Sequence, residues 1–396
     1  MDKKVPEIRF EGFVDDWEQR KLGEVASVYD GTHQTPNYVD KGVMFLSVED
    51  ISTLKSEKFI SEAVFLEEFK VSPERGDILM TRIGNIGTTN VVRANEKLAY
   101  YVSLALLKTK DSDSDFLSTL MQTPTVQKEI WERTLHVAFP KKINKSEIEK
   151  VLLHAPNKSE QAAIGNFFHT LDDTIALHQE KLEALKKMKT AYLDKIFSQE
   201  IRFSGFCGTW EQRKLGEVAG SSFGGGTPST ANDAFWNGDI PWLQSSDLTE
   251  HDIMQVNLRK HITQKGLEGS AAKLVPAKSI AIVTRVGVGK LGIIPFQYTT
   301  SQDFLSLSNF NVDIWFGGYM IYNKLQKEVN SVQGTSIKGI TKEELLNKTI
   351  KVPPTIPEQT AIGNFFRNID DTIALHHQKI DSLHKLKHAY LQKMFS

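Results

Sequence analysis

WEQRKLGEVA fills residues 17–26, and the same ten letters return at residues 210–219. The copied stretch is longer than this decapeptide, because residues 8–26 and 201–219 match at 15 of 19 positions. Each copy is followed by more than a hundred residues that have little in common with their counterparts. The chain therefore repeats a frame, and it does not repeat what the frame holds.

A second and longer repeat pairs residues 160–198 with residues 358–396, which match at 25 of 39 positions. The inserts between the copied segments, 27–157 and 220–355, share scattered letters. Solenoid proteins repeat many units of about 20 to 50 residues, whereas this chain repeats one large unit twice. Two such units in one chain predict an internal pseudo-twofold axis, with two different modules on a common frame.

The composition is that of an ordinary globular protein. Of 396 residues, 40% are hydrophobic and 24% are charged, which suits two or more domains with apolar cores. No apolar run approaches the roughly 18 to 20 residues of a membrane helix, and the first residues lack the apolar centre of a secretory signal. We therefore expect a cytoplasmic protein without a membrane partner. Cys207 is the single cysteine, so no internal disulfide can form.

The charge balance bears on nucleic-acid binding. A net charge of −1 lacks the basic excess of a protein that holds DNA phosphates without help. Any affinity for DNA must then come from local patches or from a more basic partner.

The long copied segments are predicted to be helices. Asn157 with Glu160, and Thr355 with Glu358, have the spacing of a capping box at a helix N-terminus. Beyond these starts, apolar or partly apolar residues recur in steps of three and four, as in the narrow seam of a two-stranded coiled coil. They are Leu171, Ile175, His178, Leu182, Leu185, Met188, Tyr192 and Ile196, then Ile369, Ile373, His376, Ile380, Leu383, Leu386, Tyr390 and Met394. The two helices are predicted to pair, and the pseudo-twofold axis makes the pair antiparallel.

The predicted seam indicates a measuring role. Its 26 residues, 171–196, would span about 39 Å, which is close to the roughly 34 to 36 Å of one DNA turn. Such a helix pair could hold two DNA-reading modules at a fixed spacing. A dimerisation stalk unrelated to DNA is the alternative that the pattern leaves open. His178 and His376 lie on the seam, but no carboxylate or cysteine is placed to complete a zinc site, so we expect no metal.

Each insert is predicted to be mixed α and β. Short apolar strands are expected at residues 43–48, 77–83, 101–107 and 279–286, and helices near residues 116–131 and 316–329. Polar and aromatic loops stand out at residues 30–38 and 223–236, whose side chains could bond base edges or phosphates. An ordinary turn with inward-packed aromatics is equally consistent with each of these residues.

The sequence lacks the motifs of enzymes that act on DNA bases or nucleotides. It has neither the glycine-rich cofactor loop nor the Asn/Asp-Pro-Pro-aromatic pocket of base methyltransferases. The stretch 285–292, RVGVGKLG, is not a phosphate loop, because Thr284 and Leu291 replace the required glycine and hydroxyl residue. Hydrolase and zinc-protease signatures are missing as well. We therefore expect a chain without catalytic residues.

Taken together, the motifs resemble a known family. The similarity is to specificity subunits of type I restriction-modification systems, and it covers essentially the whole length. It rests on the decapeptide, GTHQTPNY at residues 31–38, GGGTPST at 224–230, FWNGDIPWLQSSDL at 235–248 and the paired EQ-x-AIGNFF helices. It implies an α+β fold in which two globular α/β target-recognition domains alternate with two long helices that pair as an antiparallel coiled coil. The implied domains are residues 1–158 and 199–356, and the implied spacer helices are residues 159–198 and 357–396.

The resemblance also implies a function and partners. Each target-recognition domain would read one half of a divided site in double-stranded DNA, and the helices would set the gap. Two modification subunits would bring S-adenosylmethionine and methylate adenine, and restriction subunits would use ATP and Mg²⁺ for translocation and cleavage. This chain would hold no cofactor and would be a non-catalytic subunit. A coiled-coil scaffold whose modules bind proteins is the alternative function.

Carried onto this sequence, the resemblance implies seam residues and DNA contacts. The seam would be formed by Ile175, Leu182, Leu185, Tyr192, Ile373, Ile380, Leu383 and Tyr390. The DNA-contact candidates are His33, Gln34, Tyr38, Arg82, Asn85, Lys141 and Lys142 in the first module, and Ser229, Arg285, Lys290, Ser336 and Lys338 in the second. Arg82 and Arg285 occupy equivalent places in the TRIG and TRVG turns. A phosphate contact and a structural bond to a carboxylate are both open for these two arginines.

Overall fold

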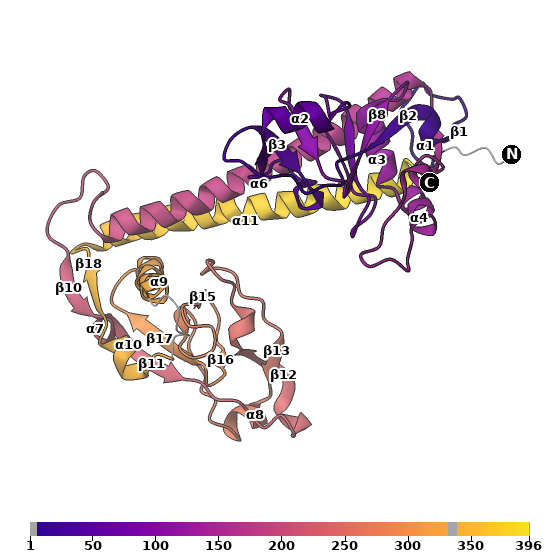
Figure 1. The fold of residues 1–396 in the computed structure, drawn as a ribbon. Helices are drawn as coiled ribbons and strands as arrows, with labels where there is room; N and C mark the ends of the chain where they lie inside the picture. Colours follow the sequence, from indigo (N-terminus) through magenta and orange to yellow (C-terminus); the bar gives the residue numbers. More distant parts are fainter. Residues whose placement is uncertain (1–5, 332–338, 396) are drawn as a thin grey trace. The chain divides into compact units, whose positions relative to one another are not determined.

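The computed structural model describes residues 6–331 and 339–395. They form two compact units, and each unit contains one globular domain and one part of each long helix (Figure 1). Unit 1 comprises Met1–Gln179 and Lys379–Ser396, and unit 2 comprises Glu180–Gln378. The long helices are α6 (Lys158–Phe197) and α11 (Ile356–Lys393). Each unit therefore contains parts of both long helices, and not only the helix that follows its domain in the sequence.

Unit 1 is built on an antiparallel four-stranded sheet in the order β2-β8-β5-β6. These strands are Ala26–Asp30, Leu104–Thr109, Ile78–Thr81 and Thr89–Val91. A second sheet has the order β4-β3-β7, with a parallel β3–β7 pair. Its strands are Phe59–Ile60, Val43–Leu46 and Leu98–Tyr100. One apolar cluster that includes Phe45, Leu79 and Leu106 joins the two sheets.

Short helices complete the globular part of unit 1. They are α1 (Leu22–Val25), η1 (Val48–Asp50), α2 (Glu62–Glu68), α3 (Ser114–Met121), α4 (Pro124–Glu132) and α5 (Lys145–Ile148). The single helix predicted near residues 116–131 is therefore two helices. The break falls at Thr123, because Pro124 lacks an amide hydrogen and starts a new helix at its first position.

Unit 2 repeats this plan. Its four-stranded sheet has the order β11-β17-β14-β15, and its three-stranded sheet has the order β13-β12-β16. The first sheet consists of Ala219–Gly224, Phe304–Phe310, Ser279–Val283 and Leu291–Ile294. The second consists of Lys260–Ile262, Trp236–Leu243 and Thr299–Thr300. The equal strand orders confirm two repeated α/β modules.

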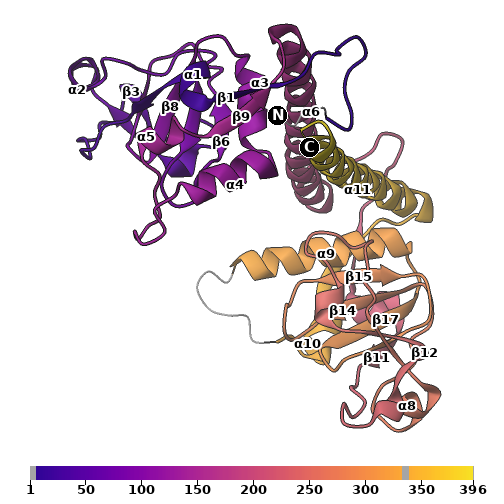
Figure 2. The same ribbon diagram turned by 90° about the vertical axis from the view of Figure 1, so that its right-hand side faces the viewer.

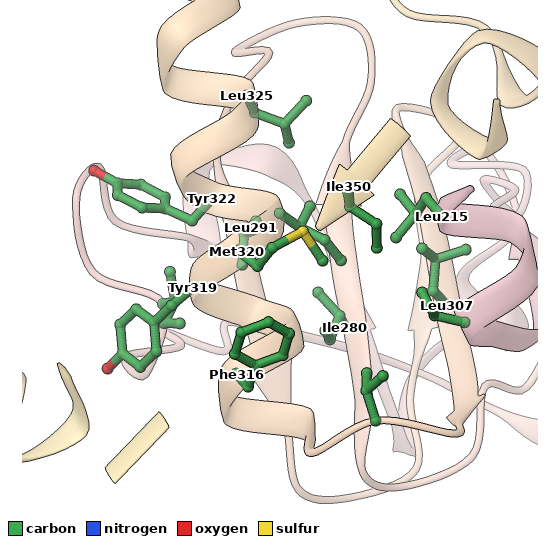
Figure 3. Close-up of a cluster of buried hydrophobic side chains, with 14 of the residues drawn as sticks. Leu215, Ile280, Leu291, Leu307, Phe316, Tyr319, Met320, Tyr322, Leu325 and Ile350 are labelled. Carbon is green, nitrogen blue, oxygen red and sulfur yellow. The ribbon is translucent and has the colours of Figure 1, made fainter. Parts of the chain in front are cut away.

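Helix α9 (Ile314–Ser331) covers one face of the unit 2 sheet (Figure 2). In Figure 3, Phe316 and Met320 point from α9 toward Ile280 on β14, and Tyr319 and Tyr322 point to the opposite side of the helix. The helical stretch predicted near residues 316–329 is thus one unbroken helix. The remaining short helices are α7 (Leu215–Val218), η2 (Asp233–Phe235), η3 (Ser245–Asp247), α8 (Gln264–Glu268) and α10 (Lys342–Leu346).

The copied decapeptide forms the same structure in both units. In unit 1 its EQRK segment is β1 (Glu18–Lys21), which pairs antiparallel with β9 (Leu152–Ala155) just before α6. In unit 2 the same letters form β10 (Glu211–Lys214), which pairs with β18 (Thr349–Val352) just before α11. The decapeptide therefore closes each domain onto the strand that leads into its long helix.

The arginine of the copied IRF stretch, Arg9 in unit 1 and Arg202 in unit 2, binds a buried glutamate near the start of a long helix. The Arg9 guanidinium donates to both carboxylate oxygens of Glu160 at 2.6 Å, and Glu160 is fully buried. In unit 2, Arg202 donates to both oxygens of Glu358 at 2.7 Å. Of the two predicted capping boxes, the one at α6 is half formed. There the Asn157 side chain accepts from the Glu160 amide at 3.1 Å, but the Glu160 carboxylate faces Arg9 because a charged, bidentate partner is stronger.

Within each unit the two long helices lie side by side and run antiparallel, as predicted. In unit 1, Leu171 and Ile175 of α6 form a buried cluster with Leu383 of α11, and Phe167 packs edge-on against Tyr390 with ring centres 5.0 Å apart. In unit 2, Tyr192 packs edge-on against Phe365 of α11 at 5.2 Å. Of the predicted seam residues, the buried ones are Ile175, Leu182, Ile380 and Leu383, and the partly buried ones are Leu185, Tyr192, Ile373 and Tyr390.

A copied ion pair links the two helices in each unit. In unit 1, Lys387 of α11 lies 2.6 Å from the Asp172 carboxylate of α6. The equivalent residues in unit 2 are Lys189 of α6 and Asp370 of α11, also 2.6 Å apart. The pair has exchanged helices between the units, as an antiparallel pseudo-twofold arrangement requires. A shift of one helix along the other would break both pairs, so they specify the register.

The surroundings of the two ion pairs differ. The side chains of Lys189 and Asp370 are 6% and 4% exposed, whereas those of Lys387 and Asp172 are 20% and 50% exposed. The Tyr319 hydroxyl also donates to Asp370 at 2.7 Å. Burial raises the pKa of the Asp370 carboxyl above its ordinary value, although Lys189 and Tyr319 act in the opposite direction. In the buried pair, each charge therefore depends on the opposite charge, because little water is available to replace it.

The two copies of this pair give a matched test. Lys189→Ala leaves the Asp370 carboxylate buried without its cation and should lower the free energy of unfolding by about 3 kcal/mol. Lys387→Ala removes the same contact where water can replace it and should cost less than about 1 kcal/mol. Urea denaturation of the full chain measures both. Equal losses would show that burial of the pair has no role.

Candidate functional site

The first candidate site lies at one end of strand β5 in unit 1, where Arg82 follows the strand. Arg82 is 8% exposed. Its Nη1 atom contacts the carboxylate of Asp30, and its Nε atom donates a hydrogen bond to the Ile143 carbonyl at 3.2 Å. Asp30 ends strand β2, and Ile143 lies just before helix α5. One buried guanidinium thus joins three separate stretches of the chain.

Backbone hydrogen bonds hold the same stretches together. The Ile143 amide donates to the Arg82 carbonyl at 3.0 Å, and the Gly84 amide donates to the Lys141 carbonyl at 3.0 Å. An isolated β-bridge also links Ile83 with Lys142. We call these stretches the three tip loops of unit 1, and they span residues 30–38, 82–88 and 133–144. Their bases form one tied cluster.

The tip loops carry the DNA-contact candidates that the sequence predicted in the first module. The exposed candidates are His33, Gln34, Tyr38, Asn85, Lys141 and Lys142. Arg82 differs from them, because its guanidinium is buried against Asp30. That arrangement is the structural alternative that the sequence left open for this arginine. The tyrosine ring of Tyr38 lies edge-on against Phe45 at 5.8 Å and stays 46% exposed, so this ring is anchored on one side and open to solvent on the other.

In unit 2 the equivalent turn follows β14, and its arginine is exposed. The Thr284 amide donates to the Asp303 carbonyl at 2.7 Å, and the Ile340 amide donates to the Thr284 carbonyl at 2.7 Å. Arg285 is exposed beside this bonded core, and Lys290 is partly buried with its ammonium 3.6 Å from the Glu250 carboxylate. Ser229 is exposed, and its carbonyl accepts from the Trp236 indole at 3.0 Å. Ser336 and Lys338 lie outside the described residues.

The contrast between the two arginines has a simple cause. Strand β2 ends at Asp30, opposite Ala105 of β8, whereas β11 ends at Gly224, opposite Leu305 of β17, so a glycine stands at the place of Asp30. The backbone bonds of Arg82, to Ser103 and Ile143, are made in unit 2 by the buried Thr284, to Asp303 and Ile340, so Arg285 lies one position further along and is exposed. The two turns thus present different groups because the arginine is shifted by one position relative to the bonded backbone.

The predictions did not include several residues that the structure places at this site. Asp30 is the carboxylate that fixes Arg82, and Trp131, Val137 and Phe139 are exposed apolar side chains in or beside the third tip loop. A carboxylate at the end of a strand was the available signal for Asp30. Nothing in the local sequence distinguishes exposed from buried aromatic residues, so Trp131 and Phe139 could not be identified that way.

A second candidate surface lies in unit 1 between α6 and the copied segment that carries Phe10. It is a shallow groove made almost entirely of copied segments. Its lining residues are Phe10, Ala163, Asn166, Phe167, Thr170, Leu171 and Thr174. Phe10 packs edge-on against Phe167 at 5.9 Å, and in unit 2 the equivalent Phe203 packs edge-on against Phe365 at 5.4 Å. The same apolar contact is therefore presented once in each unit.

In the part of the chain that the structure describes, no three His, Cys, Asp or Glu side chains come together in a way that could hold a metal ion. Among the same residues, none of the helices combines the length and the apolar character needed to cross a bilayer.

Comparison with known sequences gives two matches to one family model. The model is described as the type I restriction modification DNA specificity domain, and it matches residues 14–187 and 208–385. The MjaIX specificity subunit of a type I restriction enzyme from Methanocaldococcus jannaschii is 27% identical over 182 residues, which are 45% of this chain and 41% of that protein. The EcoR124I/EcoR124II specificity subunit from Escherichia coli is 29% identical over 235 residues, which are 56% of each protein. These alignments span about half the length of the two relatives.

A solved structure shares the fold. The crystal structure of a type I restriction-modification S subunit from M. genitalium resembles this chain with a TM-score of 0.68, at 13% identity and over 99% of both chains. The frame of two domains and two long helices is thus the fold of that structure.

The role assigned to Arg82 can be tested by substitution. Arg82→Ala removes the guanidinium and leaves Asp30 without its cation, so all three tip loops should lose order together. Hydrogen exchange of the backbone amides in residues 30–38, 82–88 and 133–144 should then rise at least tenfold. Asn85→Ala is the matched control, because it changes an exposed residue of the same turn. Faster exchange confined to one loop would contradict the tie.

Proposed function

Because the chain belongs to the type I restriction-modification DNA specificity family, we propose that each globular domain reads one half of a divided sequence in double-stranded DNA. The observation that carries the proposal is the division between copied and divergent residues. The copied residues make the helix, strand and ion-pair contacts of the frame, and the divergent inserts hold the exposed tip loops. A common frame with two different surfaces suits one molecule that must recognise two different half-sites.

The tip loops of unit 1 hold side chains suited to DNA. Gln34 and Asn85 are exposed amides, and an amide can bond both the N6 and N7 atoms of adenine in the major groove. Lys141 and Lys142 are exposed cations that can neutralise phosphates. In this proposal Arg82 is a positioning residue that holds the loops in place, and Arg285 of unit 2 contacts a phosphate directly.

The overall charge is relevant to how tightly the chain binds alone. A net charge of −1 means that the local cations supply few phosphate contacts. We therefore expect the isolated chain to bind DNA weakly and with little dependence on sequence, and to gain affinity when partner subunits add further contacts.

The copied groove suits a partner that binds twice. Residues Phe10 and Phe167 of unit 1 have identical counterparts in Phe203 and Phe365 of unit 2, so one kind of subunit could use both surfaces. We assign these surfaces to two modification subunits, with restriction subunits added in the complete enzyme. S-adenosylmethionine, ATP and Mg²⁺ would then belong to those partners, and this chain would supply recognition without catalysis. A complex that acts on host DNA would work in the cytoplasm.

The continuous long helices suit a role in spacing. Helix α6 runs from Lys158 to Phe197 and helix α11 from Ile356 to Lys393, and each is shared between the two units. Because the ion pairs and aromatic contacts fix the register in each unit, the number of residues between the units would set the gap between half-sites.

Mapping methylated adenines tests the function. The full chain is mixed with its modification subunits and random-sequence DNA. The complex should then methylate a motif of two half-sites with a constant gap. Replacing residues 220–355 with the insert of another family member should change one half-site and leave the other unchanged. A scaffold whose modules bind proteins is the alternative, and it would assemble with the partners without any sequence preference. A change in both half-sites would show that the domains do not read independently.

The spacing role gives a separate prediction. Four residues inserted after Gln179 in α6, together with four after Gln378 in α11, fall between the contacts of the two units. They add about 6 Å of helix, so the gap should lengthen by one or two base pairs of about 3.4 Å each. Sequencing of the methylated motif measures the gap. An unchanged gap, in a variant that still methylates, would contradict a measuring role.

A further inference from the structure

The third tip loop of unit 1 carries two apolar side chains that are wholly exposed. Val137 is 99% exposed and Phe139 is 103% exposed. Single exposed apolar residues are common on proteins, but an aromatic ring without any cover at a loop tip is not. Neither the predicted DNA contacts nor the copied groove uses these two residues.

The loop has a firm base, so its tip is held outward. The Leu135 amide donates to the Lys142 carbonyl at 2.8 Å, and the Ile143 amide donates to Arg82 at 3.0 Å. The His136 ring lies against Trp131 with ring centres 4.3 Å apart. These contacts engage the residues on both sides of Phe139, which stays in solvent.

The charge around the tip suits DNA better than a protein groove. Residues 133–144 contain three cations, Arg133, Lys141 and Lys142, and no Asp or Glu. Arg133 is paired with Glu129 at 2.9 Å, whereas Lys141 stacks on the Trp131 ring with its ammonium 4.3 Å from the ring centre and remains exposed. Two exposed lysines follow Phe139 within three residues, in a chain whose net charge is −1. Cations beside an apolar tip suit DNA, whose phosphates are negatively charged and whose stacked bases are apolar.

The tip is also tied to the proposed reading loops. Arg82 bonds Asp30 at the base of residues 30–38 and Ile143 at the base of the third loop. The exposed ring therefore belongs to the same cluster as Gln34 and Asn85, and a duplex bound there would lie within its reach.

We propose that Phe139, supported by Val137, inserts between neighbouring base pairs of the half-site while Lys141 and Lys142 hold the adjacent phosphates. This inference rests on the proposed function and adds a contact that depends on how easily a base step unstacks. Apolar wedges that part base steps are an established means of bending DNA and of favouring flexible steps. Phe139 would thus contribute to sequence preference without any hydrogen bond to a base.

The second domain does not share the device in its sequence. The corresponding segment, residues 331–339, reads SVQGTSIKG and contains no aromatic residue. The wedge is therefore a property of the first half-site alone, and a base step in the second half-site provides an internal comparison.

Fluorescence of 2-aminopurine tests the proposal. The complex of the full chain with its modification subunits is bound to duplexes that carry the methylated host motif, with 2-aminopurine placed at one step after another. Apart from the methylated adenines, which a methyltransferase extrudes, the wild type should raise the fluorescence at one step of the first half-site, because unstacking relieves quenching. Phe139→Ala should remove this signal and weaken binding about ten- to a hundredfold. Phe139→Leu should restore part of both.

Controls separate the possible outcomes. Leu66→Ala removes an exposed apolar side chain elsewhere in unit 1, on α2, and should leave both the signal and the affinity unchanged. Unchanged fluorescence and affinity in Phe139→Ala would overturn the wedge. So would loss of the modification subunits from that variant on size exclusion, because the tip would then contact a protein. A wild-type complex with no sequence preference would instead overturn the proposed function itself.

Discussion

The closure of each domain core by an aromatic ring at the end of a long helix is the contact on which the rest of the structure depends. Phe395 packs among Trp17, Phe116 and Phe168, with ring centres 5.8 to 5.9 Å away. Its copy, Phe197, packs in the same way against Trp210, Phe316 and Phe366 of unit 2. A buried Phe contributes about 1.5 to 3 kcal/mol, and each ring pair adds about 0.5 to 1.5 kcal/mol. The last residues of the chain thus complete the core of the first domain.

This closure explains which residues are copied. The Arg9–Glu160 and Arg202–Glu358 pairs attach each domain to the start of its helix, and the Lys–Asp pairs fix the register between helices. Gly165 is also constrained, because a Cβ at this position would lie 2.3 Å from the Asp113 side chain at the start of α3. Such contacts tolerate little change, because a substitution would leave a buried charge without its partner or place a methyl group where there is no room. The bases of the tip loops are held in this way too, but their exposed side chains make few such contacts and can differ between the units.

The sequence was enough to predict the frame but not the environments of individual surface residues, for physical reasons. Helix periodicity and the repeat are enough to give two antiparallel helices and two α/β modules, because those features follow from local pattern and symmetry. The role of Glu160 was missed, since its carboxylate is taken by Arg9, which lies 151 positions away in the chain. Arg82 and Arg285 could not be distinguished either, because their environments depend on whether Asp30 or Gly224 ends the neighbouring strand and on which residue of the turn bonds the backbone beside it. Exposure of Phe139 depends in the same way on the folded loop and not on its letters.

The exchange of the Lys–Asp pair between helices has a consequence for how such a molecule could be assembled. Since each helix carries both a lysine and an aspartate at matching places, one domain with one helix would be complementary to a second copy of itself. Separate half-length chains of two kinds would then mix at random, and only about half of the pairs formed would be of the mixed kind, by simple statistics for equal affinities. When the halves are joined in one polypeptide, every molecule contains one domain of each kind. The covalent link achieves this without an interface that distinguishes unlike halves from like ones.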